Sequence, residues 1–311
     1  MLLADQSRPT NRPSYREAHF LMCPPHHFEV KYSINPWMDP GAWATKASYL
    51  ADAADIQWQT LYEALVTHGA KIEVIRAIPD LPDLVFTANA AVILDGKALL
   101  ARFRHPERRG EEPVFARALH KLRSQAALEV VAELPTNLTL EGSGDCIWDS
   151  KRAHFWLGFG PRSDRGSQQV VADFFGVDCV PLELLDARFY HLDTAFCPLP
   201  SGEIIFYPPA FTKSALGALA ERVAPSEQII LSESDATRFS ANAISFGRQI
   251  LLSGCSEELR RELEERGYSV IAIPLHAFLK SGGSACCLTL RTNHLSECSA
   301  ADRRHSTQYV H

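Results

Sequence analysis

The chain has 311 residues, with 31 Lys and Arg against 37 Asp and Glu, so its formal net charge is -6 with His neutral. Hydrophobic residues make up 46% and charged residues 22%, which excludes a disordered chain, a collagen-like repeat and a coiled coil. The net negative charge argues against a nucleic-acid partner. No apolar run approaches the roughly 18 residues of a membrane helix, so no membrane partner is expected either.

The two ends of the sequence are polar. Residues 1–17 have no long apolar run after a basic start, so we expect a flexible N-terminal tail without a signal peptide. Residues 296–311 are expected to form a C-terminal tail. Because no linker rich in Pro, Gly or Ser separates them, residues 18–295 are predicted to fold as a single domain.

Three segments predict helices. Trp43–Gly69 carries apolar residues at helical spacing and ends on glycine, a residue that favours the left-handed conformation after a helix. Pro113–Leu122 is the second segment, and Ser256–Gly267 is the third. The third begins with Ser256 as N-cap and has two glutamates in its first turn.

Three further segments predict β-hairpins. Each has two short apolar runs around a turn dipeptide, and the segments are Ala88–Phe103, Ala195–Tyr207 and Ala241–Gly254. The last is followed by a helix and the strand Ser269–Ile273. The tripeptide Ala-Asn-Ala opens two of these units, at 88–90 and 241–243. This recurrence predicts an α/β fold of pseudo-repeated units arranged around an axis.

A cysteine pair follows a glycine-rich segment near the end of the predicted domain. Two glycines at 282–283 allow a sharp turn, and Cys286 and Cys287 follow at the start of an apolar run. A nucleophile at a loop–strand junction is exposed yet held by rigid backbone, which suits covalent catalysis. In a strand the two thiols face opposite sides, so at most one points into a given pocket. The alternative is that both pack in the core as small hydrophobes.

Two other segments carry groups suited to proton transfer. In an expected strand at 190–194, His191 and Asp193 face the same side and place an acid–base group beside a carboxylate. A surface His–Asp pair is the alternative. Glu141 lies in a Gly-rich bend, where its carboxylate can orient a histidine or accept a cation. The Gly, Ser and Asp residues around it suit a plain turn equally well.

Polar side chains also recur before and after the first predicted hairpin. Asp83 and Asn89 share one face of an expected strand, where they could line a pocket, although an ordinary half-exposed strand gives the same pattern. Arg108 and Arg162 lie in loops, and arginine binds carboxylates through paired donors. For the segment around Arg108, the alternative is a solvated, charge-balanced loop.

Taken in order, these segments resemble the guanidino-group-modifying enzymes, a superfamily of arginine deiminases, dimethylarginine dimethylaminohydrolases, amidinotransferases and arginine dihydrolases. The resemblance extends from about Phe20 to Arg291. Its most specific parts are His191-Leu-Asp193-Thr and the Gly-Gly-Ser-x-x-Cys-Leu-Thr segment, whose cysteine is Cys287. It implies a five-bladed α/β propeller, or pentein, built from hairpin–helix–strand units, which would explain the pseudo-repeat.

Three details are similar to the arginine dihydrolase branch. They are the segment Met22–Met38, the bend Glu141-Gly-Ser-Gly-Asp145, and Phe86-Thr-Ala-Asn89, where deiminases and dimethylarginine hydrolases carry Asp in place of Asn. Carboxylates hold a guanidinium cation, whereas an amide can both donate to and accept from neutral citrulline. The amide at Asn89 therefore favours a dihydrolase.

The resemblance also implies roles for the candidate residues. Cys287, as thiolate, attacks the central guanidinium carbon, with Cys286 as the neighbour that faces away. His191 protonates departing ammonia and then activates water to hydrolyse a thiouronium intermediate, while Glu141 orients His191 and favours its charged form. The implied substrate-binding set comprises Asp193 and Asp83 for the guanidinium, Arg108 and Arg162 for the substrate carboxylate, and Asn35 and Asn89 for the neutral intermediate.

The expected reaction converts L-arginine to L-ornithine, CO2 and two ammonia, so the expected partner is a small arginine-like guanidino compound. No cofactor is expected, because the thiol and the imidazole supply the chemistry. No metal is expected either, because the lone pair His26-His27 beside prolines is more typical of a loop than of a zinc site.

Other functions stay open at this point. An arginine deiminase or dimethylarginine dimethylaminohydrolase would release citrulline, an amidinotransferase would pass the amidino group to an amine, and a binding protein would not turn arginine over. The sequence also leaves open whether the chain forms a homo-oligomer. Its eight cysteines are too dilute for a disulfide scaffold, so a reduced, cytoplasmic protein is expected.

Overall fold

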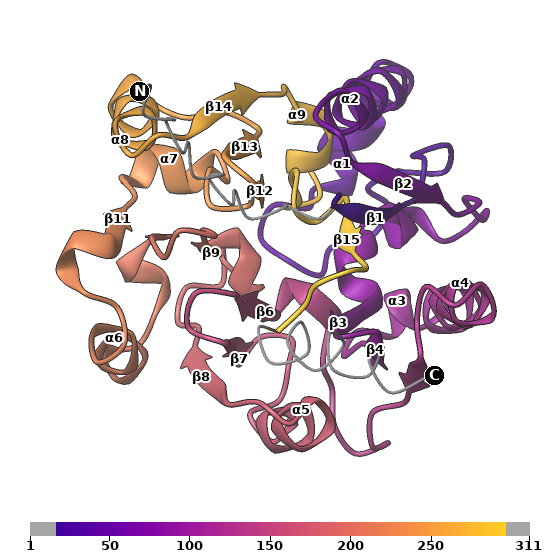
Figure 1. Cartoon of the computed structure of the whole chain (residues 1–311). Helices are drawn as coiled ribbons and strands as arrows, with labels where there is room; N and C mark the ends of the chain where they lie inside the picture. Colours follow the sequence, from indigo (N-terminus) through magenta and orange to yellow (C-terminus); the bar gives the residue numbers. More distant parts are fainter. Residues whose placement is uncertain (1–16, 297–311) are drawn as a thin grey trace, which may run out of the picture.

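The computed structural model describes residues 17–296, whose strands form five three-stranded sheets around a central axis (Figure 1). In each sheet an inner strand pairs antiparallel with a middle strand, and the middle strand pairs in parallel with an outer strand. The predicted five-bladed α/β propeller is therefore confirmed. The predicted tails lie outside the described residues, apart from Glu17 and Ser296.

The same order of strands recurs in every sheet. From inner to outer strand, the sheets are β15 (Leu290–Arg291), β1 (His19–Met22) and β2 (Lys71–Val74); β3 (Ala91–Leu94), β4 (Lys97–Leu100) and β5 (Val130–Ala132); β6 (Cys146–Asp149), β7 (His154–Phe159) and β8 (Cys179–Glu183); β9 (Phe196–Pro198), β10 (Ile204–Phe206) and β11 (Gln228–Ile230); and β12 (Ile244–Phe246), β13 (Gln249–Leu252) and β14 (Ser269–Ala272). The first sheet joins the two ends of the described chain, with Phe20 opposite Arg291, and this pairing closes the ring.

Each middle strand reaches its parallel outer strand through a crossover, and each crossover contains a helix. These helices lie on the outside of the ring (Figure 1) and are α2 (Ala47–Thr67), α4 (Glu112–Ser124), α5 (Ser167–Phe175), α6 (Lys213–Ala220) and α8 (Glu257–Glu265). Four shorter helices are α1 (Pro40–Ala44), α3 (Pro106–Arg109), α7 (Glu233–Thr237) and α9 (His276–Leu279). Within residues 17–296, no helix combines the length and the apolar character that crossing a membrane requires.

The predicted helices and hairpins are confirmed, with shifted ends. The segment Trp43–Gly69 divides into α1 and α2, and α4 contains the predicted Pro113–Leu122. Ser256 caps α8 as expected, since its hydroxyl accepts a hydrogen bond from the backbone N–H of Leu259 at 3.2 Å. The first hairpin turns at Asp95-Gly96, whose φ values of 52° and 73° are those that a type I′ turn needs.

The strand expected around Asp83 and Asn89 is wrong. These residues lie in two short 3₁₀ helices, Pro82–Val85 and Thr87–Ala90, whose backbone groups bond locally from Phe86 N to the Asp83 carbonyl. Proline at the first position of the first turn suits this conformation, because its nitrogen has no proton to donate to a sheet. The side chains of Asp83 and Asn89 therefore extend from two 3₁₀ helices, and not from a strand, into the same pocket.

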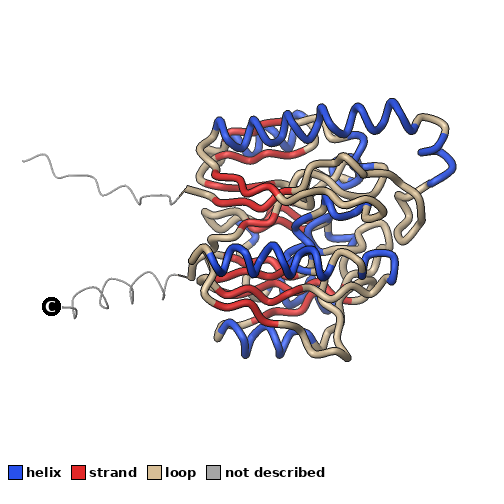
Figure 2. Tube along the Cα trace, turned by 90° about the vertical axis from the view of Figure 1, so that its right-hand side faces the viewer, coloured by secondary structure: helices blue, strands red, loops and turns tan. Residues whose placement is uncertain are grey.

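The other two expected strands near the site are also wrong. His191 directly precedes the 3₁₀ helix Leu192–Thr194, and the chain after Cys287 turns before it becomes β15 at Leu290. All three segments connect to the start of an inner strand. In the side view, loops and short helices project beyond one end of the strands (Figure 2). The coils at the starts of the inner strands position the site.

Candidate active site

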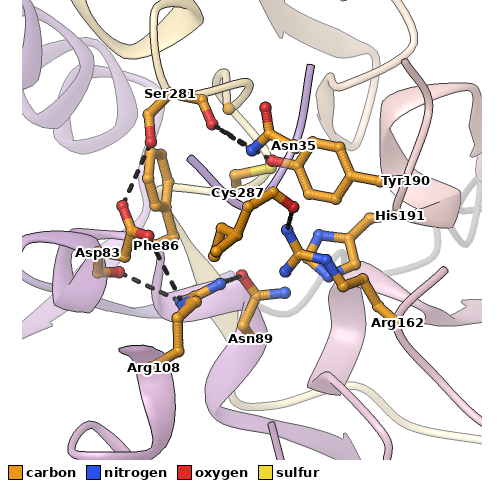
Figure 3. A pocket seen from close by; sticks show the side chains of 12 residues that line it. Asn35, Asp83, Phe86, Asn89, Arg108, Arg162, Tyr190, His191, Ser281 and Cys287 are labelled. Atoms are coloured by element: carbon orange, nitrogen blue, oxygen red, sulfur yellow. Dashed lines mark hydrogen bonds and ion pairs between the residues drawn. The ribbon is translucent and has the colours of Figure 1, made fainter. Parts of the chain in front are cut away.

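Side chains that precede the five inner strands build one pocket, some by lining it and others by contacting the lining residues. Asp83 and Asn89 precede β3, Glu141 precedes β6, His191 precedes β9, Asn242 precedes β12 and Cys287 precedes β15. The pocket (Figure 3) is lined by Ile34, Asn35, Asp83, Phe86, Asn89, Arg108, Arg162, Tyr190, His191, Ser281, Gly283 and Cys287. Its charged and amide side chains suit a small polar ligand.

The thiol of Cys287 is buried between a carboxylate and an amide. Its Sγ lies 3.2 Å from Oδ2 of Asp193 and 3.1 Å from Nδ2 of Asn242. Only 2% of Cys287 is exposed, so the expectation of an exposed nucleophile is wrong. Burial and the charge of Asp193 raise the pKa of the Cys287 thiol well above its ordinary value, while the contact with Asn242 acts in the opposite direction. Forming the thiolate therefore requires a cation close by.

Asn242 connects Cys287 to the backbone of Asp193. Its Oδ1 accepts the backbone N–H of Cys287 at 3.2 Å, and its Nδ2 also donates to the backbone carbonyl of Asp193 at 3.2 Å. Sequence reasoning missed this residue. The available signal was the repeated tripeptide Ala-Asn-Ala, since the other copy holds the candidate residue Asn89.

Asp193 lies deep in the molecule. Burial raises its pKa to about 7, although the contacts with Cys287 and Asn242 lower it. Its second carboxylate oxygen, Oδ1, has no hydrogen-bond partner within the described residues. A carboxylate with one free oxygen in this position can accept a donor from a ligand that reaches the thiol.

A second cluster holds the histidine. Nε2 of His191 lies 2.7 Å from Oε2 of Glu141, and Nη1 of Arg162 donates to the same oxygen at 3.0 Å. Although burial opposes ionisation, Arg162 and His191 hold the pKa of Glu141 well below its ordinary value. Burial lowers the pKa of His191 to about 4 and outweighs Glu141, which raises it. His191 is therefore neutral at pH 7, and Nε2–H donation to Glu141 would leave Nδ1 as the acceptor.

Arg162 is fixed on three sides. In addition to Glu141, it donates from Nη2 to the carbonyl of Ile34 at 2.9 Å, and its guanidinium stacks 4.5 Å above the ring of Tyr190. The Tyr190 hydroxyl in turn donates to the carbonyl of Gly282 at 3.0 Å. These contacts connect the histidine cluster to the segment that carries the cysteine.

Arg108 lies across the pocket from Arg162 (Figure 3). Its Nε and Nη2 donate to the two carboxylate oxygens of Glu111 at 2.9 and 2.7 Å, and its Nη1 donates to Oδ1 of Asn89 at 2.9 Å. Burial raises the pKa of Glu111 to about 7, against the opposing effect of Arg108. Oδ2 of Asp83 lies 4.0 Å from the Arg108 Nε, so this side of the pocket holds a cation between two acids.

Two amide side chains complete the lining. Nδ2 of Asn89 donates to the backbone carbonyl of Glu141 at 2.9 Å, and Nδ2 of Asn35 donates to the carbonyl of Ser281 at 3.0 Å. A Cβ at Gly144 would lie 2.4 Å from Nδ2 of Asn89. Glycine is thus required in the bend after Glu141 because the amide passes so close, and the bend is more than a surface turn.

The structure brings all nine predicted site residues together. Seven line the pocket directly, and Glu141 and Asp193 bind two of those seven, His191 and Cys287. Besides Asn242, sequence reasoning missed Tyr32, Glu111 and Tyr190. Glu111 lies three residues after Arg108, a spacing that pairs side chains on one face of a helical turn, and this was the signal that could have identified it.

The fold and the pocket place the chain among the guanidino-group-modifying proteins. A family model described as N,N dimethylarginine dimethylhydrolase, eukaryotic, matches residues 27–293, and the chain belongs to this family. It is 35% identical to the N(G),N(G)-dimethylarginine dimethylaminohydrolase of Mycobacterium tuberculosis, over 90% of this chain and 87% of that protein.

The chain is also similar to proteins named for a different reaction. It is 39% identical to the bifunctional arginine dihydrolase/ornithine cyclodeaminase AgrE of Nostoc sp., over 94% of this chain. The chain spans about two fifths of the length of AgrE, 39% of that protein. The solved N-terminal domain of ArgZ, a cyanobacterial arginine dihydrolase bound to substrate, superposes with a TM-score of 0.82 at 37% identity and covers 90% of this chain and 99% of that one.

Proposed function

We propose that the chain is an arginine dihydrolase, which hydrolyses L-arginine to L-ornithine, CO2 and two ammonia. The observation that carries this proposal is an amide, Asn89, at a position that meets both Arg108 and the Glu141 backbone beside the buried thiol. An amide can serve a cationic substrate and a neutral ureido intermediate in turn. The similarity to AgrE and to the arginine dihydrolase ArgZ supports the same reaction.

The first half of the reaction forms and breaks one bond to sulfur. The substrate guanidinium, gripped by Asp193 and Asp83, supplies the positive charge that favours the thiolate of Cys287. The thiol proton passes to neutral His191. The thiolate attacks the guanidinium carbon, and protonated His191 gives its proton to the departing ammonia, leaving a thiouronium on Cys287.

Hydrolysis of the thiouronium uses the same groups. His191 takes a proton from water, the hydroxide attacks the carbon, and the carbon–sulfur bond breaks to give citrulline. Glu141, fixed by Arg162, orients the imidazole and stabilises each imidazolium that forms. Arg108 and Arg162 are the proposed partners of the substrate carboxylate.

The second half repeats these steps on citrulline, which stays bound. Cys287 attacks the ureido carbon, a second ammonia departs, and water releases a carbamic acid that breaks down to ornithine and CO2. Two water molecules are consumed per arginine. Asn89 and Asn35 are the proposed amides that hold the neutral ureido group.

Dimethylarginine hydrolysis is the second candidate, because the matching family model carries that description. The reaction would use the same thiol and histidine and would release citrulline and dimethylamine. The amide at Asn89 favours arginine turnover to ornithine over this reaction, because an amide can also bind the neutral ureido intermediate.

Product analysis tests the proposal. Purified protein is incubated with L-arginine, and separately with asymmetric dimethylarginine, and citrulline, ornithine, urea and ammonia are resolved by mass spectrometry and a coupled assay. We expect ornithine with two ammonia per arginine and no urea, in wild type and in the Cys286→Ser control but not in Cys287→Ser. Citrulline with one ammonia would make the protein a deiminase, and turnover of dimethylarginine alone would favour the second candidate.

We further propose that the protein works in a reducing compartment such as the cytoplasm. A nucleophilic thiol must stay reduced to act, and oxidation of Cys287 would remove the nucleophile. The seven described cysteines are all free.

A further inference from the structure

A second cavity lies on the axis of the propeller, with a volume of about 120 Å³. All five inner strands contribute to it, including Ser245 of β12 and Arg291 of β15. Cys286 lines this cavity, whereas its neighbour Cys287 lines the candidate active site. The cavity is therefore distinct from the pocket in which the proposed reaction takes place.

Arg291 brings a positive charge into this cavity. Along the chain it alternates with Leu290, which is buried in the core, so Thr289 and Arg291 both face the axis. Within residues 17–296, the Arg291 side chain donates from Nε to Oδ1 of Asn293 at 3.5 Å, and no carboxylate lies within 4.0 Å of its guanidinium. The buried arginines of the active site differ, since Arg108 and Arg162 each pair with a glutamate.

The hydroxyl of Ser245 in the same cavity is free to donate a hydrogen bond. Its oxygen is buried without a hydrogen-bond partner in the described part of the chain. Burial lowers the pKa of Arg291 to about 10, and burial together with the charge of Arg291 lowers the pKa of His294 well below its ordinary value. A half-buried cation without a counterion among residues 17–296 is unfavourable, and a bound anion would relieve this.

We propose that Arg291, with His294 and Ser245, forms a binding site for a small oxyanion, a carboxylate or a phosphate group. The guanidinium offers paired N–H donors that match two oxygens of such a group, and the hydroxyl and the imidazole add donors. His294 also lines a neighbouring groove with Asn293 and Leu295. Asp193, the one acidic residue in the lining, is engaged through Oδ2 with Cys287.

Calorimetric titration of the full chain tests this site without any turnover. The probes are inorganic phosphate and, separately, acetate, at constant ionic strength set with sodium chloride. We expect at least one probe to bind the wild type, with the tighter one identifying the ligand chemistry. Arg291→Met should weaken that binding at least about tenfold, because it removes a charged hydrogen-bonding group. Arg117→Met, on the exposed face of α4, is the matched control and should bind as the wild type does.

Thermal unfolding supplies a second readout. The binding probe should raise the midpoint of the wild type by about 2 °C or more relative to chloride, whereas Arg291→Met should show no such rise and be at least as stable as the wild type in chloride. If Arg291→Met fails to fold, Arg291→Lys keeps the charge but not the paired donors and should bind the probe more weakly than the wild type. The site does not exist if neither anion binds, or if Arg291→Met or Arg291→Lys binds with wild-type affinity.

Discussion

The tripeptide Ala-Asn-Ala occurs just before two inner strands, and its asparagine has different hydrogen-bond partners at the two positions. Asn89 precedes β3, where its amide joins the Arg108 guanidinium to the Glu141 backbone. Asn242 precedes β12, where its amide joins the Cys287 thiol and backbone to the Asp193 carbonyl. Both asparagines are buried. The repeated fold thus places an asparagine at the same position before two inner strands. The residues of the neighbouring blades determine which groups each amide contacts.

The two regions also differ in charge. Around Asn89, the Arg108 guanidinium is balanced by Glu111 and Asp83. Around Asn242, a single carboxylate, Asp193, faces a thiol whose pKa is raised. The cation missing from the second region is the one that a guanidino substrate would bring, which links substrate binding to activation of the nucleophile.

The largest effect is expected from removing the nucleophile on the Asn242 side. Cys287→Ser should lower turnover of arginine by about a thousandfold or more, as loss of a catalytic nucleophile does elsewhere. Cys286→Ser should stay close to wild type, because Cys286 lines the axial cavity. Steady-state ammonia release measures both, and equal losses in the two variants would contradict the assignment.

A carboxylate in place of Asn242 tests that amide's role. Asn242→Asp would place a second negative charge beside the thiol, so the pKa of Cys287 should rise and kcat/KM should fall about a hundredfold. The pH profile of alkylation by iodoacetamide should move to higher pH by about one unit. Asn89→Asp is the control. An equal shift in its alkylation profile would show that Asn242 has no special effect on the pKa of Cys287.

The same substitution at Asn89 should instead change the products. Asn89→Asp favours the cationic substrate over neutral citrulline, so citrulline should accumulate and ornithine formation should fall about tenfold. The ratio of citrulline to ornithine at early times measures this. An unchanged ratio would show that Asn89 does not distinguish the two bound species.

The smallest expected effect is that of pH. The pKa of Asp193 is raised to about 7, so the carboxylate proposed to bind the guanidinium is ionised above this pH and is protonated as the pH falls through it. His191 stays neutral down to about pH 4 and does not limit the acid side. We therefore expect kcat/KM to fall below about pH 7. Glu111 titrates in the same range, and disappearance of this fall in Glu111→Gln would assign it to Glu111 in place of Asp193.

The repeated units were predictable because they depend on local patterns. Apolar runs around Asp95-Gly96 and the amphipathic segment at Ser256–Gly267 predict a hairpin and a helix without any knowledge of the elements that pack against them. The closing sheet was not predictable in this way, since β1 and β15 pair across nearly the whole chain. Nothing local to either short strand indicates the other.

The site shows a similar division. Residue types, their order and the resemblance to guanidino-group-modifying enzymes gave all nine candidates, but the expected strands around Asp83, His191 and Cys287 are wrong. Alternation in a strand cannot turn side chains from five blades toward one point, whereas short 3₁₀ turns can. Burial of Cys287 and the neutral state of His191 follow from tertiary packing, which no sequence pattern reports.

The central claim is that one thiol attacks twice, first the guanidinium and then the ureido carbon. Acid quenching of wild type during turnover of arginine labelled with ¹³C at the guanidino carbon, followed by peptide mass spectrometry, tests it directly. We expect two labelled adducts on the peptide at Cys287, a thiouronium and a thiocarbamoyl group in which one nitrogen is replaced by oxygen. Only the first adduct, with labelled citrulline released, or an adduct that maps to Cys286, would contradict it.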